Sequence, residues 1–116
     1  MQVNPIGVFK AEDYTNELSS AYIFGAKFAL KQGSVITIEF VVVDVNNIPN
    51  GATVLTIPSE LRPTSNFVGG VGVAAETIGA GGIGTLFTVQ PNGEVIANYE
   101  TNFTASVVRG IIVYSL

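Results

Sequence analysis

The stretch TVLTIPSELRP, from Thr53 to Pro63, decides the fold class of this chain. It is a run of β-branched and apolar residues that stops at Ile57-Pro58 and leaves through Arg62-Pro63. Proline has no N–H to donate to a sheet and its ring fixes φ, so strand pairing must end there. We therefore predict a strand that ends in a rigid corner. We expect the Arg62 guanidinium to donate hydrogen bonds to nearby carbonyls in this corner, and not to contact a ligand.

Strand patterns also dominate the sequence on both sides of this corner. β-Branched and aromatic residues fill short segments that are separated by turn signals such as Asn50-Gly51 and Pro91-Asn92-Gly93. No window shows helical amphipathicity over more than about two turns. The sequence predicts strands over residues 21–30, 34–45, 52–57, 67–76, 85–90, 94–99 and 105–116. We therefore expect an all-β chain, a small jelly-roll or Greek-key sandwich or barrel of seven to eight strands.

The first predicted strand carries two specific expectations. Tyr22, Phe24 and Phe28 share one parity along residues 21–30, which predicts that they lie on one face. Gly25 suggests a bulge or a close approach of another backbone.

Two further strands are unusual in composition. Residues 34–45 are β-branched almost throughout, which predicts a central strand whose valine run is buried on both faces. In residues 67–76, Gly69, Gly70 and Gly72 weaken the strand unless another backbone packs closely against it. We expect this close approach to occur between subunits.

Length and composition predict one domain that associates with other copies. The 116 residues fit one β-sandwich head domain over residues 21–116, preceded by an amino-terminal arm over residues 1–20. Only 12% of the residues are charged and 47% are apolar, and the mean hydropathy is +0.46, so a monomer has few polar groups to cover its surface. We expect the extra apolar area to meet another subunit. No apolar run is long enough for membrane insertion, and no secretory signal is visible.

Composition also argues against most catalytic and cofactor chemistry. The chain has no histidine and no cysteine, which removes the usual general base, the usual metal ligands and the thiolate nucleophile. The net charge is −4 and the five cations are scattered, so we expect no nucleic-acid partner. Residues 79–84, GAGGIG, lack the Lys-Ser/Thr of a P-loop and precede a strand, so they predict a plain loop. No carboxylate lies in a catalytic or metal-binding motif, and we expect a protein that is not an enzyme and needs no cofactor or metal.

The corner and the hairpin that follows it, LFTVQPNGEVIANY at residues 86–99, together resemble a known family. A corner of the form LTIPSELRP, an NGEV hairpin and an apolar last strand are similar to carboxy-terminal head domains of tailed-phage receptor-binding and tail-fibre (baseplate) proteins, of the lactococcal siphophage kind. The resemblance covers roughly residues 50–116. It implies a homotrimer in the virion, at the tail tip or baseplate, that acts outside the cell. It also implies contact with other virion tail proteins and recognition of a host cell-wall saccharide.

A shallow saccharide site needs one aromatic face and a few polar groups with fixed hydrogen bonds. Tyr99, Glu100 and Asn102 concentrate these groups in one short connection and are our first candidates. Tyr14 and Tyr22 are the next candidates. The alternative for Tyr22 and Tyr99 is that they are half-buried strand residues, because aromatic rings fill cores efficiently.

Two other functions fit the same sequence. A structural or decoration protein of the virion would share the fold and the apolar interface but bind only protein. A carbohydrate-binding module of an enzyme would bind sugar but is expected to be monomeric.

Overall fold

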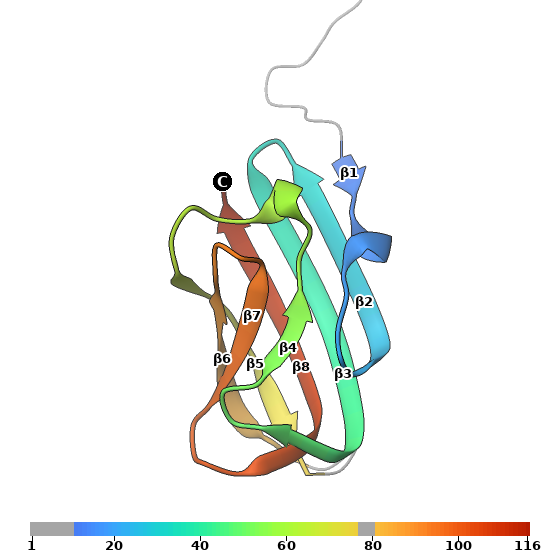
Figure 1. Cartoon of the computed structure of the whole chain (residues 1–116), viewed down its shortest axis with the longest axis vertical. Coiled ribbons are helices and arrows are strands. Elements are labelled where there is room, and N and C mark those ends of the chain that lie inside the picture. The colour runs from blue at the N-terminus through green and yellow to red at the C-terminus, as the bar shows by residue number, and fades with distance from the viewer. Residues whose placement is uncertain (1–10, 77–80) are drawn as a thin grey trace, which may run out of the picture.

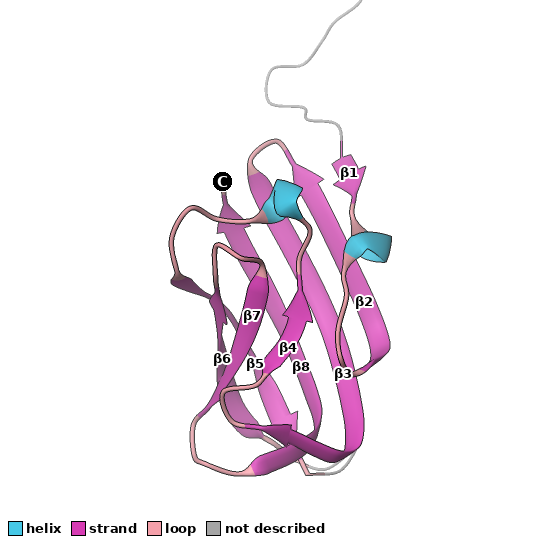
Figure 2. Ribbon diagram, in the orientation of Figure 1, coloured by secondary structure: helices cyan, strands magenta, loops and turns pink. Residues whose placement is uncertain are grey.

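The computed structural model of the chain describes residues 11–76 and 81–116, and it is all-β (Figures 1 and 2). The described residues form eight strands and two short 3-10 helices, with no α-helix among them. The elements, in chain order, are β1 (Ala11–Asp13), η1 (Thr15–Glu17), β2 (Ile23–Gln32), β3 (Val35–Pro49), β4 (Thr53–Thr56), η2 (Ser59–Leu61), β5 (Phe67–Ala75), β6 (Ile83–Val89), β7 (Glu94–Tyr99) and β8 (Thr104–Ser115). In this part of the chain no helix is long and apolar enough to cross a bilayer.

The eight strands form one antiparallel sheet in the order β1-β2-β3-β8-β5-β6-β7-β4. The sheet curls, so that β4 and β7 lie in front of β3 and β8 in Figure 1. Ser19 joins the chain before β2 to β4 through two backbone hydrogen bonds with Thr56, of 3.1 and 2.7 Å. Strands β4 to β7 follow a Greek-key order. The prediction of a small all-β sandwich or barrel with seven to eight strands is confirmed.

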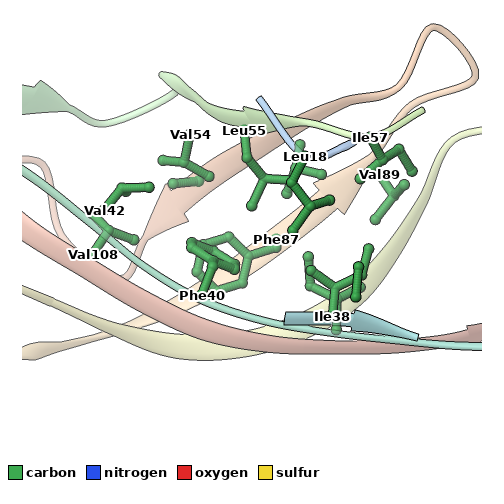
Figure 3. Packing of buried hydrophobic residues seen from close by; sticks show 14 of the residues in the cluster. Leu18, Ile38, Phe40, Val42, Val54, Leu55, Ile57, Phe87, Val89 and Val108 are labelled. Atoms are coloured by element: carbon green, nitrogen blue, oxygen red, sulfur yellow. The ribbon is translucent and has the colours of Figure 1, made fainter. Parts of the chain in front are cut away.

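The hydrophobic core fills the inside of the curled sheet. Along β3, Ile36, Ile38, Phe40 and Val42 alternate inward and are at most 2% exposed. The Phe40 ring meets the Phe87 ring of β6 edge to face, with centroids 5.1 Å apart. Figure 3 shows this pair near the centre of the cluster, with Val54, Leu55 and Ile57 on the side of the cluster away from β3. Each large side chain buried in this way stabilises the fold by roughly 1.5–3 kcal/mol.

Two central strands carry most of the sheet. β3 lies between β2 and β8, as predicted, although it continues to Pro49 and leaves only Asn50-Gly51 in the predicted turn. β8 lies between β3 and β5, so the last strand of the chain is internal to the sheet. Along β3, Val42 is buried but Val41 and Val43 on the other face are only half-buried. Burial of the valine run on both faces is therefore incomplete within one chain.

A β-bulge divides β2 into two parts. The pairing with β3 shifts between Phe24 and Ala26, so Gly25 is the bulge that the sequence suggested. Phe24 pairs with the buried Val42 and faces inward, whereas Phe28 pairs with the exposed Glu39 and faces outward. The prediction that the aromatic residues of this strand share one face was wrong, because a bulge reverses the parity of the residues that follow it.

The corner after β4 is tied to the hairpin between β6 and β7. The Arg62 Nε donates to the Ile57 carbonyl at 3.1 Å, which confirms its predicted structural role. The Ile57 N–H donates to the Gly93 carbonyl at 2.9 Å. Gly93 has φ +89°, and a Cβ there would lie 2.5 Å from the Arg62 Nε. The two sequence motifs therefore form one structural unit.

The described half of the predicted arm belongs to the same body as the strands. β1 pairs with β2, and Leu18 is buried in the core. Residues 1–10 of the predicted arm lie outside the described residues, as do residues 77–80, which include the start of the predicted glycine-rich loop.

Candidate functional site: the outer face of the sheet

The outward side of the sheet, here called the outer face, carries exposed apolar side chains. Among the described residues, eight of the nine exposed large hydrophobic side chains pair on this side by strand register, and the ninth is Leu116. The eight are Ile23, Phe28, Val35, Val68, Val71, Leu86, Ile111 and Val113. Antiparallel sheets that face water usually place polar residues on that side, so this pattern makes the outer face the candidate interaction surface.

The centre of the outer face is a row that crosses six strands. Each member is the register partner of the next, from β2 through β3, β8, β5 and β6 to β7. The row runs Phe28, Glu39, Ile111, Val71, Leu86, Asn98. Directly opposite side chains on one face lie about 4.5–5.5 Å apart at Cβ, so the row is a continuous surface.

A hollow of about 640 Å³ lies along this row. Its apolar lining includes Phe28, Val41, Val71 and Ile111. Gly72 also lines it, and a Cβ there would meet the Phe87 ring and the Arg109 carbonyl oxygen. Because the core occupies the space beneath it, this glycine leaves bare backbone in the hollow. The close backbone approach that we expected between subunits therefore occurs, at Gly72, between β5 and β8 of one chain.

Two charged side chains face each other diagonally beside the hollow. Glu39 on β3 is opposite Ile111, and Arg109 on β8 is two residues before Ile111 on the same face. Both side chains are exposed, and neither makes a hydrogen bond or an ion pair with any other described residue. The outer face therefore combines a broad apolar surface with two opposite charges, Glu39 and Arg109, that lack partners within the described residues.

A second hollow, of about 460 Å³, lies on the other side of Val71. Here the polar groups Asn98, Glu100 and Thr85 stand beside the apolar Leu86. The Asn98 Nδ2 donates to the Thr88 Oγ1 at 2.9 Å, which fixes the amide and leaves its carbonyl oxygen directed elsewhere. This arrangement can offer hydrogen bonds to a polar ligand, but it contains no exposed aromatic ring.

Tyr99 is not the exposed aromatic platform that the sequence suggested. It is only 7% exposed, because odd-numbered residues of β7 point into the core. Its hydroxyl donates to the Ile48 carbonyl at 2.7 Å, and its ring packs on Phe103 with centroids 4.9 Å apart. Burial raises the pKa of Tyr99, with a smaller contribution from Tyr22. A sugar ring cannot stack on this side chain in the folded chain.

The remaining predicted site residues do not gather around Tyr99 as one site. Glu100 is exposed and lines the second hollow, while Asn102 is exposed in the loop after β7. Tyr22 lies near Tyr99 and packs partly on the core. Tyr14 is at the other end of β2, where its N–H donates to the Ala29 carbonyl. A hydrogen bond from its hydroxyl to the Glu12 Oε2 raises its pKa.

The sequence reasoning missed the residues that the outer face brings together. Leu86 and Ile111 are next to the buried Phe87 and Ile112, so both parities of β6 and β8 carry apolar residues. In a single curled sheet only one parity can face the core, and the other must face outward. The sequence therefore shows that the outer face is apolar, but only the strand register shows which of its residues lie side by side.

The polar side chains of the described residues are either dispersed or paired. They contain no cluster of His, Cys, Asp or Glu that could hold a metal ion, and every buried side-chain nitrogen or oxygen among them has a hydrogen-bond partner. Burial raises the pKa of Tyr114, whose hydroxyl donates to the Leu61 carbonyl at 2.6 Å.

Among known proteins, no family model matches this chain and no curated protein is significantly similar to it.

Proposed function

We propose that this chain is a non-catalytic assembly domain of a tailed-phage tail tip or baseplate, and that copies of it associate through the outer face. The observation that carries this proposal is the continuous row across six strands, in which four of the six exposed side chains are apolar. The resemblance of the corner and hairpin to phage receptor-binding heads supports the virion setting and a complex of three copies. Other tail proteins of the virion are further partners in this account.

Exposed apolar area is the reason to expect association. Val71 is 58% exposed and Leu86 is 49% exposed, so a single chain leaves about half of each side chain in water. Burying apolar surface contributes roughly 25 cal/mol per Å². Covering the central apolar residues of the row therefore favours association by several kcal/mol in each contact, before the entropy of association is subtracted.

Light scattering of the purified chain tests the proposal. We expect about three times the chain mass of 12.1 kDa at micromolar concentration. Val71→Asp places a charge at the centre of the row and should shift the mass toward the monomer. Leu116→Asp is the matched control, because Leu116 is 47% exposed but lies outside the row. A wild-type chain that stays monomeric would overturn the proposal and favour a carbohydrate-binding module.

Saccharide recognition is a second candidate, and the second hollow is the observation that favours it. Glu100 and Asn98 there can accept hydrogen bonds from sugar hydroxyls, and Leu86 can contact the C–H side of the ring. Without an aromatic platform each site would bind weakly, in the micromolar to millimolar range. Several heads on one particle could then raise avidity by about 10²–10⁴.

A glycan array that displays the chain at high valency tests the second candidate. Glu100→Gln keeps the shape of the side chain but removes its charge, and should weaken saccharide binding by about tenfold. Glu60→Gln is the control, because Glu60 is exposed and lies away from the hollow, on η2. An array without hits would remove saccharide binding and leave an assembly domain that binds only protein.

A further inference from the structure

We infer that the partner of the outer face is a second copy of this chain, and that Glu39 of one copy pairs with Arg109 of the next. This inference rests on the proposed self-association and names the contact that sets its register. It follows from the position of the two charges on one apolar face.

The two charges lie on adjacent central strands, within the surface that an associating chain would cover. Glu39 and Arg109 both line the first hollow. They are diagonal neighbours across the β3–β8 pair: Glu39 is opposite Ile111, and Arg109 is opposite Val41, two residues further along β3. Any partner that covers Val71 and Ile111 must also cover these two charged side chains or lie against them.

A charge covered by an apolar surface without a partner is costly, because it loses its hydration and gains nothing in return. Glu39 and Arg109 therefore each gain from an opposite charge on the occupant. A second copy of the chain supplies both, since its own outer face carries Arg109 for Glu39 and Glu39 for Arg109. At these two positions the face is complementary to itself in charge, and along the row it is complementary in apolar character.

Other occupants fit this pattern less well. A membrane surface or a polyanion would favour a cluster of cations, but Arg109 is balanced by Glu39 on the same face and the chain carries a net charge of −4. A different protein would have to reproduce both the apolar row and the pair of opposite charges. A copy of this chain meets both requirements without further assumptions.

Charge reversal tests the pairing directly. Glu39→Arg and Arg109→Glu each place like charges in contact, and each should raise the dissociation constant of the oligomer by about a hundredfold. The double variant Glu39→Arg/Arg109→Glu restores opposite charges and should recover most of the association. Glu60→Arg changes the net charge by the same amount as Glu39→Arg, but lies away from the outer face and should leave association unchanged.

Analytical ultracentrifugation of these variants, with circular dichroism to confirm folding, separates the possible failures. A wild-type chain that is monomeric overturns both the proposed function and this inference. A wild-type oligomer that tolerates both single reversals, or a double variant that fails to recover while remaining folded, overturns the Glu39–Arg109 pairing alone.

An equal mixture of the two single variants reports the number of copies. In a closed pair, each contact joins one variant to the other, so both contacts carry opposite charges. In a ring of three, at least one contact joins two identical variants and brings like charges together. We therefore expect the mixture to associate less than the double variant. A mixture that associates as well as the double variant would support the pairing but overturn the threefold count.

Discussion

The inner and outer faces of the same sheet are both apolar, but only the inner face is covered by the chain itself. Phe87 and Leu86 are neighbours on β6, yet Phe87 is fully buried against Phe40 while Leu86 is half exposed. The difference between them is topological, because the curl of the sheet supplies a partner for one face and none for the other. Side chains of similar chemistry therefore serve folding on one face and, in our account, association on the other.

The largest expected effect comes from truncating β8, which serves both faces. Deleting residues 111–116 removes the buried Ile112 and Tyr114 together with the exposed Ile111 and Val113. It also exposes the edges of β3 and β5 along this stretch. Each buried side chain is worth roughly 1.5–3 kcal/mol, and a small domain is stable by only about 5–15 kcal/mol. We expect no cooperative thermal transition by circular dichroism; an unchanged transition would contradict the central position of this strand.

Truncating neighbouring residues of β6 should separate the two faces most clearly. Phe87→Ala removes a fully buried ring and should lower the free energy of unfolding by about 3–5 kcal/mol. Leu86→Ala should change the stability of the monomer by less than about 0.5 kcal/mol, because Leu86 is at the surface of one chain. It should instead weaken association. Urea unfolding at low protein concentration measures the free energy of unfolding, and light scattering measures association. Equal losses of stability in Phe87→Ala and Leu86→Ala would contradict the comparison.

Two glycines provide a smaller test of the same contrast. Gly72→Ala adds a Cβ that meets the Arg109 carbonyl oxygen and the Phe87 ring, and should cost about 1–3 kcal/mol of stability. Gly81→Ala is the control, because a Cβ there has no atom within 4 Å. Thermal unfolding should distinguish the two variants. A Gly72→Ala variant as stable as Gly81→Ala would show that the sheet can relax around this position.

The two buried tyrosines carry the smallest predicted effect. Burial raises the pKa of both Tyr99 and Tyr114 above the ordinary value of about 10. Above that pH the unfolded chain loses phenol protons that the folded chain keeps, so stability should fall as pH rises. Below it, Tyr114→Phe should cost about 1 kcal/mol through the lost hydrogen bond to Leu61, but it should also flatten the alkaline decline. An unchanged alkaline profile in urea unfolding would contradict this assignment.

The fold could be predicted from the sequence because its strands and turns are set by local chemistry. The corner at Pro58, the turn at Gly93 and the bulge at Gly25 each follow from the backbone limits of proline or glycine. The facing of residues after the bulge does not follow from simple alternation, because a bulge reverses the parity. The prediction that Phe28 shares a face with Phe24 was wrong for this reason.

The candidate site was harder to predict because it depends on contacts between distant strands. Tyr99, Glu100 and Asn102 are close in sequence, but alternation along β7 sends the tyrosine inward and leaves the polar residues outside. Glu39, Val71 and Arg109 are far apart in sequence and meet only through the register of β3, β8 and β5. Sequence proximity suggested a cluster that strand alternation divides between two faces, and strand register assembled another one.

Thiol accessibility on the outer face tests the central claim most directly. The chain has no cysteine, so Val71→Cys introduces a single reporter in the central row, and Leu116→Cys is its exposed control. We predict that the rate of labelling at residue 71 falls as protein concentration rises through the association range, while the rate at residue 116 stays constant. Labelling at residue 71 that remains as fast as at residue 116 at every concentration would show that copies of this chain do not cover the outer face.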